Sequence, residues 1–369
     1  MYYALLFFLP ILAAAAIVKL YFHWSYTWKE FALQLIPTFF VLIALFTLAG
    51  SLQTSDSKIV NGVVTKVESI QKNCQSGWRR TQDGHCTEHR TRSVKIGESC
   101  TTSSKGMRSC TPIYATEYKY IYPWERRYYV FTDIPNTYEI KRIDRQGQQV
   151  PPRFTEIELE DPVSITANYK NYIKGAADSL FAEEEPVETL PIAYPRVKDY
   201  YKINRVIFTG TEISNELFQD WNESFSFVNG NIRDTGANAI IVVTDSKNRD
   251  VPEALARNWH AHNINDVVTV IGRIGNVVDW VDVRSWSESS LVNVEIENEI
   301  ANLGTLDIDR INDIIEKSIL DNYEERSMED FEYLADDIFP PLWAFILAGI
   351  ILLIITPLIT LYFHKNDIA

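Results

Sequence analysis

The fold is decided by two runs of sequence, Ala239-Ile-Ile-Val-Val-Thr244 and Asp266-Val-Val-Thr-Val-Ile271. Both runs are short, apolar and rich in β-branched residues, which is the pattern of strands that are covered on both faces. Between them, Pro252 stands at the first turn of a short helical pattern, and Leu255 and Trp259 share one face of it. A helical crossover between two buried strands predicts that the strands are parallel.

The flanking sequence extends this unit into an α/β sandwich domain at 201–338. Arg205–Phe208 predicts a strand before the central pair, and Asn276–Arg284 predicts one after it, antiparallel because the link is short. Three helices complete the domain, and Gly304 and Asp307 are placed to end one helix and cap the next. The expected apolar helix faces comprise Ile213, Leu217, Trp221 and Phe225, then Val292, Ile296, Ile300 and Leu303, then Ile308, Ile311, Ile315 and Ile319.

A second, β-rich domain is expected at 51–181, before a Pro- and Glu-rich linker at 182–200. Lys58–Glu68 alternates like a strand, with Asn61-Gly62 as a bend or bulge, and aromatic runs from Tyr114 predict antiparallel partners. Asn168–Phe181 predicts a short helix. The domain carries an insert at 72–110 that holds eight basic residues against three acidic ones between Lys72 and Arg108.

All four cysteines, Cys74, Cys86, Cys100 and Cys110, lie in this insert. Such clustering is expected for two disulfides in an oxidising compartment. A hairpin favours the nested pairing of Cys74 with Cys110 and Cys86 with Cys100, although the spacing leaves the other two pairings open. The alternative is a zinc site, because His85, Cys86 and His89 have a spacing close to that of zinc ligands.

Three apolar stretches, Tyr2–Val18, Phe31–Gly50 and Leu342–Phe363, predict three transmembrane helices. They give an N-terminal helical hairpin at 1–50 and a C-terminal helix at 340–364; a signal peptide is the alternative for the first stretch. If the lysines Lys19, Lys29 and Lys365 lie in the cytoplasm, residues 51–339 are periplasmic or extracellular. The chain is therefore expected to be integral to a bacterial inner membrane or a plasma membrane.

The net charge of the chain limits the classes of binding partner that are expected. The net charge is −14; residues 1–50 carry +1 and residues 340–369 carry 0, so residues 51–339 carry −15. Such a surface excludes nucleic acid as an expected partner. Asp307–Asp337 alone holds twelve acidic and three basic residues, which is typical of a solvated helix face. The expected partners are the lipid bilayer and either another membrane protein or a second copy of the chain.

The predicted order of strands and helices in 201–337 resembles the TPM domain. The resemblance is carried by Thr235-Gly-Ala-Asn-Ala-Ile-Ile-Val-Val-Thr244, by the helix at 254–259 and by Asp266–Gly272. That family includes a thylakoid-lumen protein linked to photosystem II repair, nematode modulators of acetylcholine receptors and bacterial membrane proteins. Acid-phosphatase activity and divalent-cation binding have been attributed to some members. This chain has Arg284–Ser290 where members usually carry a Gly-rich turn.

Candidate ligands for a cation are Asp245, Asp250 and Glu288, because Asp245 follows the first central strand at the edge where α/β sheets gather ligands. Oxygen ligands of this kind suit Ca²⁺ or Mg²⁺. The alternative interpretation makes Asp245 and Asp250 turn and capping residues. His260 and His262 are expected at the surface, at the end of a helix.

No nucleophile elbow, phosphate-binding Gly loop or Ser-His-Asp pattern is visible in the sequence. The expected function is therefore that of a non-catalytic accessory, scaffolding or quality-control component of a membrane complex. The alternative is a divalent-cation-dependent phosphatase of the TPM type.

Overall fold

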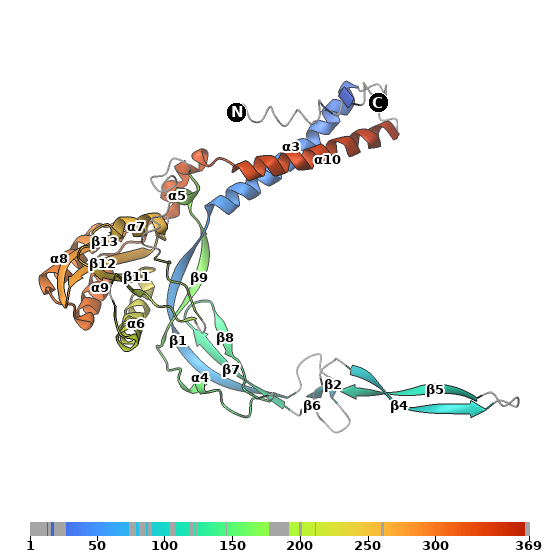
Figure 1. Cartoon of the computed structure of the whole chain (residues 1–369), viewed down its shortest axis with the longest axis horizontal. Coiled ribbons are helices and arrows are strands. Elements are labelled where there is room, and N and C mark those ends of the chain that lie inside the picture. Colours follow the sequence, from blue (N-terminus) through green and yellow to red (C-terminus); the bar gives the residue numbers. More distant parts are fainter. Residues whose placement is uncertain are drawn as a thin grey trace.

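The computed structural model shows a mixed α+β chain in three parts: a pair of long helices at one end, two sheet domains in the middle and a projecting β arm at the other end (Figure 1). The structure describes residues 13, 16–17, 27–73, 79–80, 86–87, 91–102, 108–118, 121–122, 124–144, 146–176, 192–198, 201–210, 212–259 and 262–365.

Two helices, α3 (Trp28–Thr54) and α10 (Leu342–Lys365), are long and apolar enough to cross a membrane. They pack antiparallel, because Gln34 near the start of α3 donates to Thr360 near the end of α10 (Nε2···Oγ1 2.7 Å). Most of the large apolar side chains on both helices are exposed. Of the three spans that the sequence predicts, the structure therefore shows two, and the first, Tyr2–Val18, lies almost entirely outside the described residues.

The predicted β-rich domain contains an antiparallel sheet of four strands in the order β8-β7-β1-β9. Its long strand β1 (Ser55–Asn73) begins directly after α3, and the others are β7 (Trp124–Thr132), β8 (Thr137–Ile140) and β9 (Pro162–Lys170). Apolar side chains of these strands form its core, and a short helix, α4 (Pro152–Thr155), packs beside it. In the range of the predicted helix at Asn168–Phe181, Asn168–Lys170 belong to β9 and one helical turn, α5 (Tyr172–Gly175), follows, while residues 177–181 lie outside the described residues.

Gly62 in β1 has a different role from the predicted bend. Strand β1 continues through it, and a Cβ atom there would lie 2.3 Å from Oδ1 of Asp133. The glycine is needed because the loop after β7 approaches the backbone closely. The register of β1 against β7 shifts slightly further along, between Val64 and Lys66.

The arm is a two-stranded antiparallel hairpin made of β4 (Thr91–Thr102) and β5 (Arg108–Tyr118). Short strands β2 (Arg79–Arg80), β3 (Cys86–Thr87) and β6 (Ile121–Tyr122) pair at its base. Cys100 and Cys110 lie opposite each other in the hairpin and form a disulfide. The nested pairing is therefore wrong: the tight register places Cys100 against Cys110, so neither is left for Cys74 or Cys86. Cys74 lies outside the described residues.

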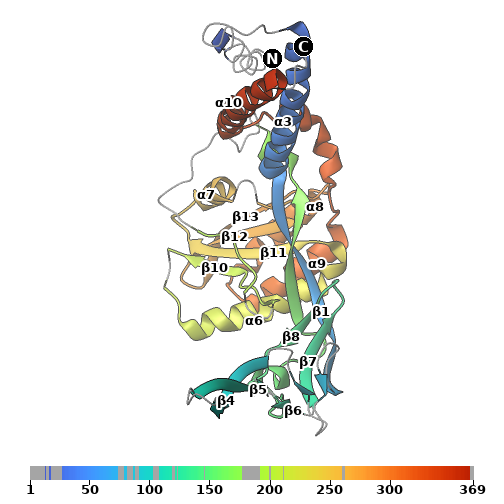
Figure 2. The same ribbon diagram turned by 90° about the vertical axis from the view of Figure 1, so that its right-hand side faces the viewer.

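The α/β domain has the sheet order β10-β11-β12-β13 (Figure 2). Strands β10 (Val206–Thr209), β11 (Asn238–Asp245) and β12 (Asp266–Ile274) are parallel, and β13 (Val277–Ser285) is antiparallel to β12, which confirms the predicted directions. Helix α7 (Val251–Asn258) covers one face of the sheet. Helices α6 (Asn215–Asn231), α8 (Leu291–Leu303) and α9 (Ile308–Asn322) cover the other face.

The ends of α8 and α9 follow the predicted signals. Gly304 ends α8 with a φ of 66°, and the side chain of Asp307 accepts a hydrogen bond from the backbone N–H of Arg310 at the start of α9. The side chain of Ser327 caps the 3-10 helix η3 (Met328–Asp337) before α10. A further 3-10 turn, η2 (Arg233–Thr235), leads from α6 into β11.

Candidate functional site

A group of buried polar side chains lies where the two sheet domains meet. It comprises Asn61 from β1, Ser164 from β9, Arg205 just before β10, Asn238 at the start of β11 and Asp266 at the start of β12. We call these five residues the seam cluster. Parallel strands begin at the same edge of a sheet, so Arg205, Asn238 and Asp266 gather at one edge. Strands β1 and β9 of the other domain lie against that edge.

Arg205 is the positive charge of the seam cluster, and only 2% of its surface is exposed. Its Nε donates to Oδ1 of Asn238 (2.8 Å), and its Nη2 donates to Oγ of Ser164 (2.7 Å) and to Oδ1 of Asn61. All three acceptors are neutral. Burial lowers the pKa of Arg205 to about 9, which still leaves the guanidinium charged at neutral pH.

Asp266 is the negative charge, and it is completely buried. Its carboxylate accepts hydrogen bonds from Nδ2 of Asn238 (2.8 Å), the hydroxyl of Tyr194 (2.9 Å) and the backbone N–H of Asn263 (2.9 Å). Burial raises the pKa of Asp266 to about 6, because these donors only partly replace water. Asn238 therefore stands between the two charges, accepting from Arg205 and donating to Asp266.

Asparagine side chains also connect the backbones of the two domains. Nδ2 of Asn61 donates to the carbonyl of Ala237 (2.9 Å), while Nδ2 of Asn265 donates to the carbonyls of Ile59 (2.8 Å) and Gly236 (2.9 Å). These bonds run in both directions across the contact. The seam cluster and its neighbours thereby fix the strand that follows α3 to the edge of the parallel sheet.

The chemistry of the seam cluster suits structure better than turnover. Its amides and hydroxyls already bond to each other, and Arg205 and Asp266 are enclosed. Removal of either buried charge is strongly destabilising, because the other charge then stays in the interior without compensation. The arrangement therefore holds the two domains in one relative position.

The three carboxylates predicted to bind a cation do not meet. Asp245 ends β11, and its Oδ1 accepts from the backbone N–H of Lys247 (3.1 Å), as the turn interpretation predicts. Asp250 precedes α7 but makes no side-chain cap bond. Glu288 follows β13, which runs antiparallel to β12, so it lies beyond the opposite edge of the sheet from Asp245. About six residues of strand, roughly 20 Å, separate these edges.

His262 contradicts the predicted surface position. It is buried with a φ of 53°, and neither ring nitrogen has a hydrogen-bond partner among the described residues. Burial, and then the positive charge of Arg284, lower the pKa of His262 to about 4. The chain turns inward after α7, which places the ring near Trp259. His260 lies outside the described residues.

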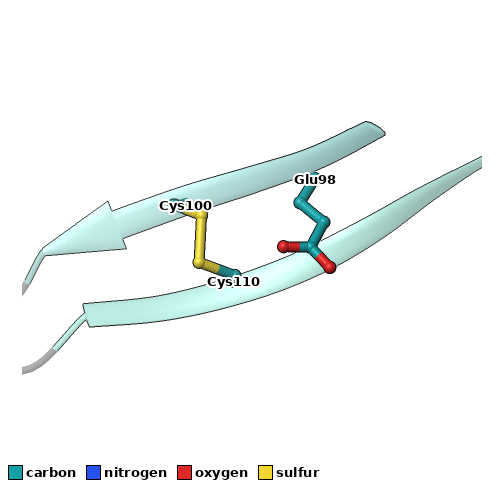
Figure 3. A group of neighbouring side chains, drawn as sticks. All are labelled: Glu98, Cys100 and Cys110. Atoms are coloured by element: carbon teal, nitrogen blue, oxygen red, sulfur yellow. A yellow bond between two sulfur atoms is a disulfide. The ribbon is translucent and has the colours of Figure 1, made fainter. Parts of the chain in front are cut away.

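The arm contains the one cluster of metal-ligand residue types found in the described part of the chain: Glu98, Cys100 and Cys110 (Figure 3). Because the two sulfur atoms are bonded to each other, neither is a thiolate that could bind a metal. This leaves no zinc ligand at Cys100 or Cys110. His85 and His89, the other residues of the zinc alternative, lie outside the described residues.

The seam cluster was not predicted from the sequence, although part of it leaves a signal there. Asn238 and Asp266 are polar residues at the N-terminal ends of two apolar strands that were predicted to be parallel, and the structure pairs them directly. Polar side chains at matching ends of neighbouring strands are expected to meet. Asn61 and Ser164 carry no such signal, because their contact with this edge depends on how two separate domains pack.

Comparison of the chain with protein-family models, with curated proteins and with solved structures found no match.

Proposed function

We propose that the chain is a membrane-anchored, TPM-like protein that acts as a non-catalytic accessory, scaffolding or quality-control component of a membrane complex. Its external domains are the parts that dock. The observation that carries this proposal is the arm, which projects away from the rest of the molecule at the end opposite to α3 and α10 (Figure 1).

The arm has little core of its own. An isolated two-stranded hairpin is only marginally stable in water. Ile96, Ile113 and Tyr114 of the arm are exposed, at fractions of 65%, 47% and 60%. The disulfide between Cys100 and Cys110 holds the strands together without burying this apolar surface. An arm held in shape by a covalent bond, with apolar side chains left uncovered, is suited to a protein partner.

The long helices support a membrane location. Helices α3 and α10 contact each other through a cluster in which Ala348 and Leu352 are buried and Leu45, Phe46 and Phe345 pack against them, and Gln34 donates a hydrogen bond to Thr360. Small residues and interhelical hydrogen bonds are typical of contacts between helices in lipid, and the exposed apolar side chains of both helices would face the acyl chains. A disulfide in the arm fits an oxidising compartment, which supports a periplasmic or extracellular position for residues 51–339.

The domain at 201–337 supports the TPM part of the proposal through its topology. Two parallel connections followed by an antiparallel strand and two helices reproduce the order on which the resemblance rests. Because one fold can host several functions, the resemblance bears on the architecture of the domain and not on its activity.

The competing function is a divalent-cation-dependent phosphatase. The feature that favours it is Asp245, which lies at the C-terminal edge of the parallel strands. Purified full-length protein in detergent would then release phosphate from p-nitrophenyl phosphate with added Mg²⁺ or Ca²⁺, and Asp245→Ala would abolish that release. The docking proposal expects Asp245→Ala to leave complex formation unchanged.

The proposal is tested by removing the apolar surface of the arm. On native gels of membrane extracts, the double variant Ile96→Ser/Ile113→Ser should move the full-length protein from the position of a large assembly towards the position of the unbound protein. The matched control is Ile143→Ser, because Ile143 is similarly exposed but lies outside the arm. An assembly that survives the arm variant and is lost only when α3 and α10 are replaced by unrelated apolar helices would contradict docking through the arm.

A further inference from the structure

A groove of about 1020 Å³ runs along the outer strand of the α/β sheet, and none of its described lining residues belongs to the arm. Strand β10 is an outer strand of this sheet and has β11 as its neighbour on one side. We call this the edge groove. Among its lining residues, Ile192, Tyr194, Arg196 and Lys198 come from the segment at 192–198, Phe208 comes from β10 and Phe218 comes from α6.

The groove exists because two neighbouring segments diverge. The backbone N–H of Lys198 donates to the carbonyl of Lys202 (2.7 Å), and that of Tyr201 donates to the carbonyl of Lys198 (3.2 Å), so the chain reverses here before it enters β10. Among the described residues, the segment at 192–198 and β10 make no backbone hydrogen bonds with each other. With respect to the described residues, the outer edge of β10 therefore has no strand beside it.

The backbone of β10 offers unused hydrogen-bonding groups to this groove. The carbonyl of Arg205 accepts a hydrogen bond from β11. The backbone N–H and C=O of the next residue, Val206, face away from β11 and bond to the side chain of Asn222 in α6 (2.9 and 3.1 Å). Because the backbone groups of successive strand residues face opposite sides, the N–H and C=O of Phe208 also face away from β11. In the described part of the chain, no group pairs with the outward N–H and C=O of Phe208. An open strand edge of this kind is a template for another strand.

The charges of the edge groove differ from those of the surrounding surface. Its charged lining residues are Arg196 and Lys198, which are exposed and form no ion pair with any described residue. They stand in a region, 51–339, whose net charge is −15. Two unpaired cations beside an apolar channel favour a ligand that carries carboxylates on an apolar backbone.

We infer that the edge groove binds an extended, acidic segment of a partner protein, which adds a strand alongside β10. The N–H and C=O of Phe208 pair with the backbone of the segment, and its apolar side chains lie between Ile192 and Phe218. Its carboxylates meet Arg196 and Lys198. This is β-strand addition, in which the main chain supplies affinity and the side-chain pockets supply specificity. The inference goes beyond the proposed function and does not depend on the arm.

The first experiment measures binding of labelled decapeptides to the full-length protein in detergent by fluorescence polarisation. The probes alternate valine or phenylalanine with glutamate, and a second set carries lysine instead of glutamate. The glutamate set should bind at least about tenfold more tightly, the factor expected for two exposed ion pairs worth about 0.7 kcal/mol each. Equal binding of the two sets would overturn the inference.

A second arm of the experiment tests strand pairing directly. N-methylation removes alternate backbone donors from the probe without changing its charge. Methylation in one register should abolish binding, and methylation in the other register should leave it nearly unchanged, because only alternate residues of a strand face its neighbour. Equal effects in both registers would show that the peptide is held by charge alone and would overturn the strand model.

The protein variants provide the matched comparison. Arg196→Glu/Lys198→Glu should lose affinity for the glutamate probe by at least tenfold, whereas Lys141→Glu/Lys317→Glu makes the same charge change on exposed residues outside the groove. The mass of each protein is measured by light scattering. If only the groove variant changes from a dimer to a monomer, a second copy occupies the groove and the partner assignment fails.

Discussion

Asp266 and His262 are both buried, and burial moves their pKa values in opposite directions. The pKa of Asp266 rises to about 6, so the contribution of this residue to stability is fully present below about pH 4 and is lost as the pH rises through 6. The pKa of His262 falls to about 4, so the contribution of this residue is present above about pH 6.5 and is lost as the pH falls through 4. Between pH 4 and 6.5 the two contributions offset each other.

Single substitutions should therefore reveal two opposite pH slopes. In Asp266→Asn, the free energy of unfolding should fall by roughly 3 kcal/mol between pH 6.5 and 4, because only His262 still titrates in the interior. In His262→Met, the free energy of unfolding should rise by a similar amount between pH 6.5 and 4, because Asp266 still titrates. Urea unfolding at several pH values measures both, with the double variant as the control. Parallel slopes in the two single variants would contradict the opposed titration.

The seam cluster shows what a sequence can and cannot predict at the level of residues. Asn238 and Asp266 share an edge because their strands are parallel, and that direction was predicted from the apolar runs. The depth of His262 was not predictable from its position after a helix, because it depends on the inward path of the next turn. The contact of Asn61 with Arg205 depends on domain packing, which leaves no local pattern.

At the scale of elements, Gly272 of β12 is directly paired with Trp280 of β13. A Cβ atom at Gly272 would lie 2.0 Å from the indole ring. The ring is held in place because its Nε1 donates to the carbonyl of Ser246 (2.8 Å), at the end of β11. The absence of a side chain in one strand thus allows an aromatic side chain from the next strand to lie across it.

Gly272→Ala should destabilise the α/β domain by about 1–3 kcal/mol, because Trp280 must leave its position and lose its hydrogen bond. Tryptophan fluorescence during urea unfolding would detect both the loss of stability and the changed environment of the indole. Gly97→Ala is the control, since a Cβ atom there meets nothing within 4 Å. Equal stability of the two variants would show that the indole moves aside without cost.

Helix α6 shows how a predicted apolar face can be correct in part. Of Ile213, Leu217, Trp221 and Phe225, the structure buries Trp221 and Phe225, whereas Leu217 is 42% exposed and Ile213 precedes the helix. Residues at intervals of four drift by about 40° per step around an α-helix, so a long run of them leaves the buried side. The buried apolar face continues instead at Val228 and Ile232, where an interval of three returns the stripe to the core. The stripes predicted on α8 and α9 each include an interval of three, and their central residues are buried.

At the scale of the whole molecule, the direct junction between α3 and β1 links the helix pair to the sheet domains. Helix α3 ends at Thr54 and β1 begins at Ser55. The backbone N–H of Asn171 donates to the carbonyl of Thr54 (2.7 Å), and Lys174 pairs with Asp56 (3.1 Å). The junction is therefore tied on its flank by the turn that contains α5.

Insertion of Gly-Gly-Ser between Thr54 and Ser55 should leave both sheet domains folded but release their orientation relative to the helices. In the full-length protein reconstituted in lipid, the distance between a spin label on the arm and the membrane surface should broaden. The same insertion after Gly275, in the turn between β12 and β13, is the control. An unchanged, narrow distance distribution would show that α10 and η3 alone set the orientation.

The continuity of α3 with β1 has a mechanical consequence. The 19 residues of β1 extend for about 60 Å at roughly 3.3 Å per residue. Transmembrane helices change their tilt when the bilayer becomes thinner or thicker. With no hinge at the junction, a change of about 10° in α3 would move the far end of β1 sideways by about 10 Å. A change in bilayer thickness that tilts α3 would therefore displace the arm, which lies beyond the far end of β1.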